Sequence, residues 1–346
     1  NALLKATGNE DGTIVGKDGV ITDPVFEPYN SGSYSLNALL GGSIHSGILS
    51  NKVTAFAGEQ GVGKTFFLLQ AAKEFLDTYP EGIFAYFDTE AATTKEMLAD
   101  RVGHLDRIMV IPVVTVQAIA TQLSNLLTKW KEERKGNPDA RLFVGLDSLG
   151  NLSTEKEITD IEEGTGTKDM TRAQLLKGTF RALTVKFATA QVPLVFTNHT
   201  YQGMGMFASK TMSGGGGPLF SASTIVFLTK KKISEGSGLK QEKVGNIINM
   251  TLFKGRMTRE GSKGKTRLFF DTGLDPYYGL LDIAKEYKIW PVSGGQCVIE
   301  GEKVSAKEIE LNPEKYFTED VLKEIDIACQ KKYLYGSSLD EETEDG

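Results

Sequence analysis

The stretch Gly58-Glu59-Gln60-Gly61-Val62-Gly63-Lys64-Thr65 decides how the rest of this sequence is interpreted. It matches the phosphate-loop pattern G-x-x-x-x-G-K-[ST] and stands between the apolar run 53–57 and a helix-like run over 65–76. In that context the glycines let backbone N–H groups surround phosphate oxygens at a helix N-terminus, while Lys64 reaches the outer phosphates and Thr65 ligates Mg²⁺. We predict that residues 58–65 and the adjacent Phe66 bind ATP with Mg²⁺.

Short apolar runs alternate with helix-like segments along the middle of the chain. The runs cover residues 53–57, 83–87, 108–111, 142–146, 194–197 and 224–228. They lack alternating polar residues, which is typical of strands buried on both faces of a parallel sheet. Between the third and fourth runs, apolar residues recur at helical spacing from Val116 to Trp130, over a span that suits a crossover helix. We therefore predict an α/β fold whose mostly parallel sheet is covered by helices.

Changes in the pattern of apolar, polar and charged residues divide the chain into four expected parts. These are an N-terminal lead-in or oligomerisation segment (1–30), the α/β core (31–274), a small α/β C-terminal domain (275–336) and an acidic tail (337–346). The core is expected to end in a hairpin formed by residues 246–253 and 266–271. In the C-terminal domain we predict a helix over 278–290, a hairpin over 296–304 and a helix over 318–335 that Thr318 caps.

Composition excludes several classes of protein. The chain of 346 residues is 40% hydrophobic and 24% charged, as an ordinary globular protein is. No apolar run is long enough to cross a membrane, and the first residues lack a secretory pattern, so we expect no membrane contact. The two cysteines, Cys297 and Cys329, form neither a disulfide framework nor a zinc motif, which favours a reducing, cytoplasmic location.

Charge is segregated along the sequence. The net charge is −6, and residues 340–345 alone contain five acidic residues. The segment 254–267 is basic: Lys254, Arg256, Arg259, Lys263, Lys265 and Arg267 stand against the single Glu260. The basic segment therefore suits nucleic-acid contact, and a solvated surface hairpin with a solubilising tail is the equally open alternative.

Acidic residues follow two of the predicted strands near the phosphate loop. Asp147 ends the run 142–146, so we expect its carboxylate beside the loop, where it can hold the water shell of Mg²⁺; a turn cap through Ser148 is the alternative. Asp88 and Glu90 both follow the run 83–87. Either of them can act on the attacking water or form a structural contact, and the residues alone do not separate the two.

Four motifs in one order resemble the RecA family of recombinases, and in particular its branch from T4-like bacteriophages. They are Asp147-Ser148-Leu149-Gly150-Asn151-Leu152, Asp169-Met170-Thr171-Arg172, Asn198-His199-Thr200-Tyr201 and Asp275-Pro276-Tyr277-Tyr278-Gly279-Leu280-Leu281-Asp282. The resemblance spans about residues 31–335. It implies a RecA-like P-loop ATPase core and a DNA-dependent ATPase that forms filaments on single-stranded DNA and catalyses homologous pairing and strand exchange.

The resemblance also implies roles for single residues. Glu90 matches the catalytic carboxylate that polarises the attacking water, and Asp147 matches the Mg²⁺-shell carboxylate. His199 takes the γ-phosphate-sensing position, with a charge expected to vary near about pH 6–7; a buried structural histidine is the alternative. Lys254 and Arg256 match two lysines that reach the neighbouring protomer's γ-phosphate; charges on a DNA-facing hairpin are the alternative. Met97 stands where the family has an adenine-stacking tyrosine.

Two long glycine-rich loops, residues 154–168 and 202–217, match the loops that hold single-stranded DNA in this family. The residues that we assign to DNA contact are Met170, Arg172, Phe207, Lys210, Gly214 and Gly215. Packing at the loop tips is the alternative for the apolar residues. The first loop is acidic, which departs from an electrostatic groove for DNA.

Two other functions remain open from the sequence. One is another RecA-core ATPase, such as a hexameric helicase or a KaiC-like regulatory ATPase, and the other is a nucleotide-gated binding protein with little turnover. The recombinase interpretation implies single-stranded DNA, homologous duplex DNA and other copies of the chain as partners, together with recombination mediator and single-strand-binding proteins, in the cytoplasm of an infected bacterium. The acidic tail is then expected to restrain duplex binding.

Overall fold

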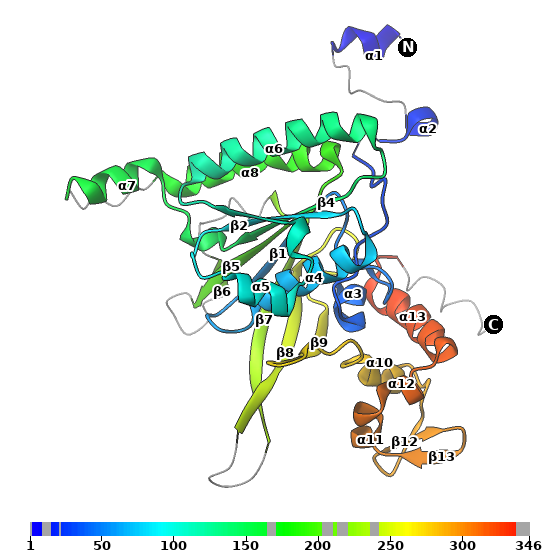
Figure 1. Cartoon of the computed structure of the whole chain (residues 1–346). Coiled ribbons are helices and arrows are strands. Elements are labelled where there is room, and N and C mark those ends of the chain that lie inside the picture. The colour runs from blue at the N-terminus through cyan, green and yellow to red at the C-terminus, as the bar shows by residue number, and fades with distance from the viewer. Residues whose placement is uncertain are drawn as a thin grey trace.

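The computed structural model describes residues 2–8, 15–20, 22–164, 171–202, 210–212, 221–235 and 242–336. Its centre is one large sheet (Figure 1). The strands of this sheet are β1 (Val53–Gly58), β2 (Ile83–Asp88), β3 (Ile108–Pro112), β4 (Leu142–Asp147), β5 (Leu194–Gln202), β6 (Lys210–Met212), β7 (Thr224–Glu235), β8 (Glu242–Lys254), β9 (Lys263–Phe269) and β10 (Gly273–Leu274). Their order is β10-β9-β8-β7-β1-β5-β4-β2-β3, with β6 paired to β5.

The middle of the sheet is parallel, as the apolar runs predicted. Strands β7, β1, β5, β4, β2 and β3 pair in parallel, so their carboxyl ends meet at one edge of the sheet. Burial on both faces was wrong for β3, where the side chains of Met109 and Val110 are 39% and 42% exposed. β3 is the last strand of the sheet, and the helices do not cover it as they cover the strands inside.

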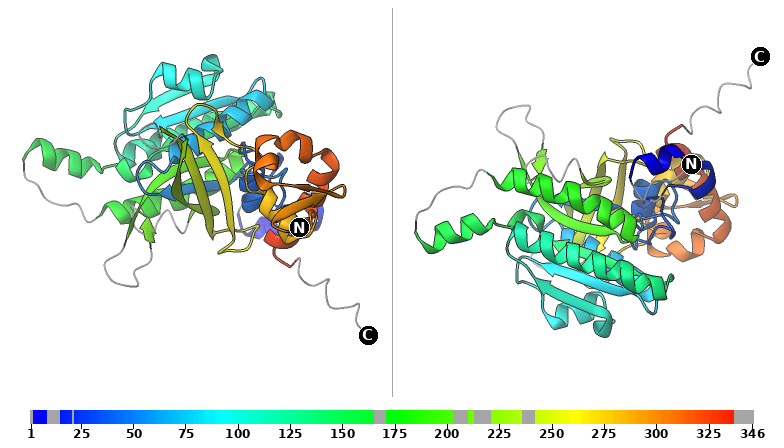
Figure 2. Two further views of the ribbon diagram at one scale, coloured as in Figure 1. Left: turned by 90° about the horizontal axis from the view of Figure 1, so that it is seen from below. Right: turned by 90° about the horizontal axis from the view of Figure 1, so that it is seen from above.

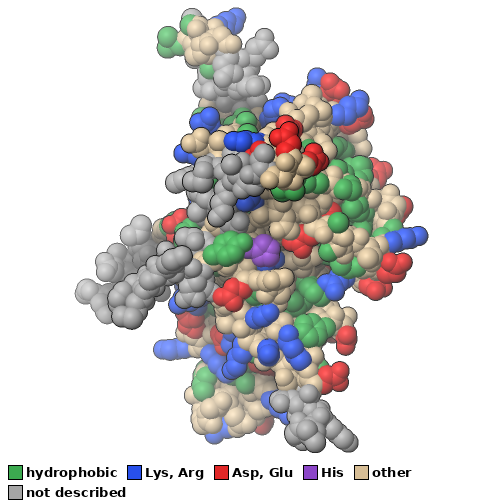
Figure 3. Space-filling view, turned by 90° about the vertical axis from the view of Figure 1, so that its left-hand side faces the viewer, with side chains coloured by type: hydrophobic (Ala, Val, Ile, Leu, Met, Phe, Trp, Pro, Cys, Tyr) green, Lys and Arg blue, Asp and Glu red, His purple; other side chains and the backbone are tan. Residues whose placement is uncertain are grey.

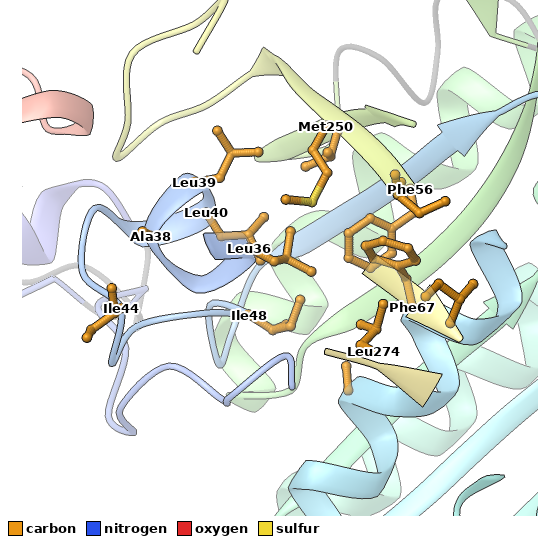
Figure 4. Packing of buried hydrophobic residues seen from close by; sticks show 14 of the residues in the cluster. Leu36, Ala38, Leu39, Leu40, Ile44, Ile48, Phe56, Phe67, Met250 and Leu274 are labelled. Carbon is orange, nitrogen blue, oxygen red and sulfur yellow. The ribbon is translucent and has the colours of Figure 1, made fainter. Parts of the chain in front are cut away.

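Helices cover both faces of the sheet (Figure 2). Those of the core are α3 (Tyr34–Gly41), α4 (Lys64–Thr78), α5 (Lys95–Arg101), α6 (Val116–Gly136) and α8 (Arg172–Ala190), while α7 (Glu155–Glu162) projects away from the sheet (Figure 1). Alternate residues of β1 point to opposite faces: Ala55 packs in the cluster with α6 and α8, while Phe56 packs in the cluster with α3 and α4. In the second cluster Leu36 of α3 lies near Phe56 and Phe67 (Figure 4).

The C-terminal part forms a small α/β module beside the sheet. Its elements are α10 (Leu280–Glu286), β11 (Val292–Ser293), β12 (Gln296–Ile299), β13 (Glu302–Val304), α11 (Ala306–Leu311), α12 (Pro313–Tyr316) and α13 (Glu319–Tyr333). The predicted hairpin is present as β12 and β13, and the hydroxyl of Thr318 caps α13 by accepting from the Val321 N–H. Ile309 and Ile325 belong to the same buried cluster as Leu36, so the module shares its core with the sheet; the boundary at 275 stays a prediction.

The hairpin predicted from residues 246–253 and 266–271 is present as β8 and β9, but it is only part of an antiparallel extension. β8 pairs along most of its length with β7, which the sequence had placed only over 224–228. Part of the basic segment also serves the fold. Lys265 pairs with Asp282 at 2.6 Å, and Arg267 pairs with Asp275 at 2.7 Å and Glu310 at 3.1 Å.

The end of the N-terminal segment is packed against the core. Phe26 is 8% exposed, and the guanidinium of Arg141 lies 3.4 Å from the centre of its ring. The carbonyl of Thr22 accepts hydrogen bonds from the side chains of Asn51 and Lys52. Helices α1 (Ala2–Ala6) and α2 (Val15–Asp18) lie away from the sheet (Figure 1). Among the residues described, no helix combines the length and apolar character needed to span a membrane.

Candidate functional site

The phosphate loop joins the end of β1 to the start of α4, where glycine is required on steric grounds. Gly63 caps α4 in the left-handed region with φ 107°, which side chains with a Cβ rarely adopt. A Cβ on Gly58 would stand 2.8 Å from the carbonyl oxygen of Leu228 on the neighbouring strand β7. The loop therefore closes tightly between β1 and α4, as the motif predicted.

Lys64 is folded into the loop that it follows. Its side chain is nearly buried, and Nζ donates to the carbonyl oxygens of Gly58 and Glu59, both at 3.1 Å. Burial lowers the pKa of Lys64, while the negative charges of Asp147 and Glu90 act in the opposite direction. Anionic phosphate oxygens would replace the carbonyls as stronger acceptors for this ammonium group.

Asp147 lies directly beside Thr65 at the end of β4. Its Oδ2 accepts from Thr65 Oγ1 at 2.6 Å and from the Tyr86 hydroxyl at 3.1 Å, and its Oδ1 accepts from Thr197 Oγ1. A carboxylate next to the phosphate-loop hydroxyl is the donor set that suits Mg²⁺ held jointly with nucleotide phosphates and water. The described residues contain no cluster of three or more His, Cys, Asp or Glu side chains that could hold a metal ion.

The two carboxylates that follow β2 have different surroundings. Asp88 Oδ1 accepts from the backbone N–H groups of Glu90 and Ala91 at 2.9 and 3.0 Å, so Asp88 holds the turn that follows the strand. Glu90 instead faces the loop: its Oε1 accepts from Ser148 Oγ at 3.1 Å and lies 3.8 Å from His199 Nε2. Of the two carboxylates, Glu90 lines the cleft beside Lys64 and Asp88 does not.

His199 lies between Lys64 and Glu90. It is paired with Gly58 in the register of β5 and β1, and its Nδ1 lies 3.4 Å from Lys64 Nζ. Burial and the charge of Lys64 lower the pKa of His199. The expected change of charge near pH 6–7 is therefore shifted to more acidic pH. With Lys64 donating to Nδ1, we assign the proton of the neutral ring to Nε2, on the side of Glu90.

These residues line one cleft of about 610 Å³ at the carboxyl edge of the sheet. The lining residues are Glu59, Gln60, Gly61, Gly63, Lys64, Thr65, Phe66, Glu90, Arg101, Asp147, Asn151, His199, Thr200 and Tyr201. Most were predicted from the sequence, and Gly58 and Val62 support the loop from beneath. On the face of the molecule that lies to the left in Figure 1, Lys and Arg side chains gather in the lower half (Figure 3).

Comparisons with known proteins agree with this arrangement. The chain is 33% identical over 251 residues to a "Recombination and repair protein" of Enterobacteria phage T4, covering 72% of this chain and 61% of that protein. It is 27% identical over 266 residues to "Protein RecA" of Treponema denticola, covering 76% of this chain and 60% of that protein, and 23% identical over 267 residues to "Protein RecA" of Malacoplasma penetrans. The chain belongs to the RecA family. No protein-family model matches it, and it spans about three fifths of the first two relatives.

The two basic residues matched to the RecA family's interface lysines lie away from the chain's own cleft. In the sheet, Lys254 of β8 lies opposite Ile225 of β7, and Ile225 lies opposite Ala55 of β1. Ala55 comes three residues before Gly58, where the phosphate loop begins. At ~3.3 Å per residue, Lys254 stands roughly 10 Å behind the carboxyl edge. Burial and the charge of Arg256 lower the pKa of Lys254. Neither residue lines the cleft of its own chain.

The residues assigned to DNA contact through the RecA resemblance are only partly described. Met170, Phe207, Gly214 and Gly215 lie outside the described residues, and Lys210 is described only by its backbone in β6. Arg172 bonds the carbonyl oxygens of Leu152 and Gly150 at 2.6 and 2.5 Å, so its guanidinium supports the turn after Asp147. Its contact with DNA stays a prediction.

Sequence reasoning missed several residues of this RecA-type cleft. Tyr86 and Thr197 bond Asp147 from the strands on either side of β4, a contact that only the sheet register reveals. Lys230 of β7 donates to the carbonyl oxygen of Gly61 at 2.6 Å. Arg101 of α5 lines the cleft, whereas Met97, one turn earlier, packs against the core.

Proposed function

We propose that this chain is an ATP-dependent DNA recombinase, which assembles as a filament on single-stranded DNA and pairs that strand with a homologous duplex during recombination, repair and recombination-dependent replication. The observation that carries the proposal is the placement of two incomplete halves of one site. Lys64, Asp147 and Glu90 meet in the cleft, while Lys254 and Arg256 lie outside its lining, from where we propose that they reach another copy of the chain. The similarity to a "Recombination and repair protein" of phage T4 supports the same function.

ATP and Mg²⁺ are the ligands that we propose for the cleft. The loop N–H groups and Lys64 bind the phosphates, and Thr65 and Asp147 hold the metal, Asp147 through water. When bound, Mg²⁺ neutralises phosphate charge that develops during transfer. The hydroxyls of Tyr86 and Thr197 fix the Asp147 carboxylate, so that it presents its oxygens to the metal side in one orientation.

Glu90 is the residue that we propose to orient the attacking water. Its carboxylate accepts from Ser148, which leaves its other oxygen able to accept from a water beside the outermost phosphate. His199, neutral with its proton on Nε2, stands next to Glu90 and Lys64. It can therefore respond to the outermost phosphate and transmit that state along β5 to the loop that follows.

Completion of the site by a neighbour explains how turnover can depend on assembly. Cations supplied in trans stabilise transition-state charge and are worth large factors in rate in other phosphoryl-transfer enzymes. Lys254 and Arg256 are two such cations on one strand end, and the charge of Arg256 also lowers the pKa of Lys52 beside them. We propose that this cluster faces the cleft of the next copy in the filament.

Single-stranded DNA, duplex DNA and other copies of the chain are the partners that the proposal requires. Mediator and single-strand-binding proteins are further expected partners, in the cytoplasm of the infected host. Because non-specific DNA binding rests on contacts with phosphates, affinity for single-stranded DNA should fall steeply as salt rises. A ring-forming helicase of the same core would differ in the shape of its assembly.

Electron microscopy tests this proposal directly. With a non-hydrolysable ATP analogue, the protein should form extended helical filaments on single-stranded DNA, and with ATP it should exchange a labelled strand into a homologous duplex. Closed rings on DNA would favour a helicase instead. Absence of both filaments and strand exchange would reject the recombinase function.

A further inference from the structure

Arg101 and Phe66 form a stacked pair at one side of the cleft. Phe66 follows Thr65 in the first turn of α4, and Arg101 is the last residue of α5. The guanidinium carbon of Arg101 lies 3.7 Å from the centre of the Phe66 ring, and both side chains line the cleft. Two elements that are separate in the chain thus place a flat cation over a flat ring at a ligand site.

Much of the rest of the lining has proposed tasks at the phosphates. The loop with Lys64 surrounds the phosphates, Asp147 and Thr65 take the metal side, and Glu90 with His199 lies on the side of the attacking water. A nucleotide also has a base, which must leave the phosphate loop toward a surface suited to a planar ring. Among the described residues that line the cleft, Phe66 and Arg101 provide such a surface as a partly buried stacked pair, whereas Tyr201 is 59% exposed.

Arg101 has little else to explain its position. Among the described residues no carboxylate lies within ion-pair distance of it, and its guanidinium instead contacts the Phe66 ring. Burial lowers the pKa of Arg101, with Asp100 acting in the opposite direction, so the partly buried guanidinium is desolvated without a bonded anion. A guanidinium that rests on a ring by one face keeps its other face available for a second π system.

We infer that Arg101, supported by Phe66, is the stacking platform for the base of the bound nucleotide, in the place for which Met97 was considered. The inference rests on the proposed function of the cleft as an ATP site, and it concerns recognition of the base. A platform that stacks by its π face tolerates different bases, so we expect weak discrimination between purine nucleotides. In the alternative, Arg101 binds a phosphate oxygen of the nucleotide, and that contact requires only the positive charge of the side chain.

Binding of ADP, measured by calorimetry without DNA, separates these alternatives. Arg101→Ala and Arg101→Lys should both weaken ADP binding by about tenfold, because lysine keeps the charge and lacks the flat face. Phe66→Leu should weaken binding by a smaller factor, since the guanidinium loses its support. Lys95→Ala is the matched control: it removes a positive charge from α5 outside the cleft, and ADP binding should stay unchanged.

A diphosphate nucleotide of 2-aminopurine reports stacking itself, because stacking quenches the fluorescence of that base. At saturation the unmodified protein should quench it, and both Arg101 variants should relieve the quenching; a merely structural role would leave the quenching of bound nucleotide intact. Wild-type affinity in Arg101→Ala, or full rescue by Arg101→Lys, would overturn the inference. Failure of the unmodified protein to bind ADP would instead reject the proposed nucleotide site.

Discussion

Glu90 is held at the cleft by its neighbours on both sides. Its N–H donates to Asp88, and its carboxylate accepts from Ser148, so the side chain is fixed toward the phosphate loop. Asp88 has a different task, since it holds the turn through two backbone N–H groups. This geometry separates the two carboxylates, which the sequence left as alternatives.

Glu90→Gln should abolish turnover and leave nucleotide binding nearly unchanged. The amide keeps the shape of the side chain, but it loses the charge that polarises the water, so steady-state ATP hydrolysis on single-stranded DNA should fall by roughly 100-fold or more. Glu96→Gln, on the exposed face of α5, is the control and should retain activity. Retention of ATP hydrolysis in Glu90→Gln would remove the role assigned to Glu90.

His199 should make the fold less stable in acid. Burial and Lys64 hold the folded-state pKa of His199 below its unfolded value. The unfolded chain therefore takes up a proton first, and the free energy of unfolding should fall as pH drops through about 6.5, then level off below the folded pKa. In urea titrations, His199→Gln should lose less stability than the unmodified protein between about pH 7.5 and about pH 5.5.

Identical pH profiles for His199→Gln and the unmodified protein would contradict the partly buried, neutral state of His199.

Local pattern explains which site residues could be predicted. The loop from Gly58 to Thr65 has a fixed spacing of residue types, and Asp147 stands at the end of an apolar run. Both could therefore be predicted from the sequence alone. Tyr86, Thr197 and Lys230 reach the site from other strands, and their contacts depend on strand order and register. No spacing within the sequence carries that information.

At the scale of elements, the apolar runs predicted the strands because parallel strands are buried on both faces. The same rule failed at β3, where position at the sheet edge leaves Met109 and Val110 exposed. The rule also predicted too short a strand β7. Beyond residue 228 the strand continues through the polar residues Lys230, Lys231 and Lys232, since it pairs there with the antiparallel strand β8 outside the core. At a sheet edge or in a two-stranded extension, strand formation depends more on pairing with the neighbouring strand than on the hydrophobicity of the residues.

The basic segment shows why charge alone left two interpretations open. Lys265 and Arg267 form ion pairs with carboxylates of the C-terminal module, so their charges help to hold the fold. At the other end of the same segment, Lys254 ends β8 opposite Ile225 of β7, and Arg256 follows it. A linear count of charges treats both groups alike, while the fold separates them.

Arg267 should therefore matter for stability. It is 17% exposed, bonds Asp275 and Glu310, and lies 4.6 Å over the Tyr278 ring. Arg267→Ala should lower the free energy of unfolding in urea by about 2 kcal/mol, because it leaves a partly buried carboxylate without its partner. Lys323→Ala breaks an exposed pair with Asp320 and should cost less than about 0.5 kcal/mol. Equal effects of the two substitutions would show that the Arg267 pairs do not anchor the module.

At the scale of the whole molecule, the sheet separates the two halves of the proposed site. The cleft opens at the carboxyl ends of the parallel strands, and Lys254 lies further back, at the end of β8. On the proposed function, one chain holds each half of the site on a different part of its sheet, and the two halves meet only between copies. Assembly in one direction along DNA would join each cleft to the cations of the next copy.

Mixing two inactive variants on single-stranded DNA tests this account. Lys64→Ala has a defective cleft and intact interface cations, and the double substitution Lys254→Ala, Arg256→Ala has the reverse. Each alone should hydrolyse ATP poorly, and electron microscopy should verify that both enter one filament. The mixture should then hydrolyse ATP faster than the two separate proteins together, because some interfaces join an intact cleft to intact cations. A co-assembled mixture with no gain in hydrolysis would contradict the shared site.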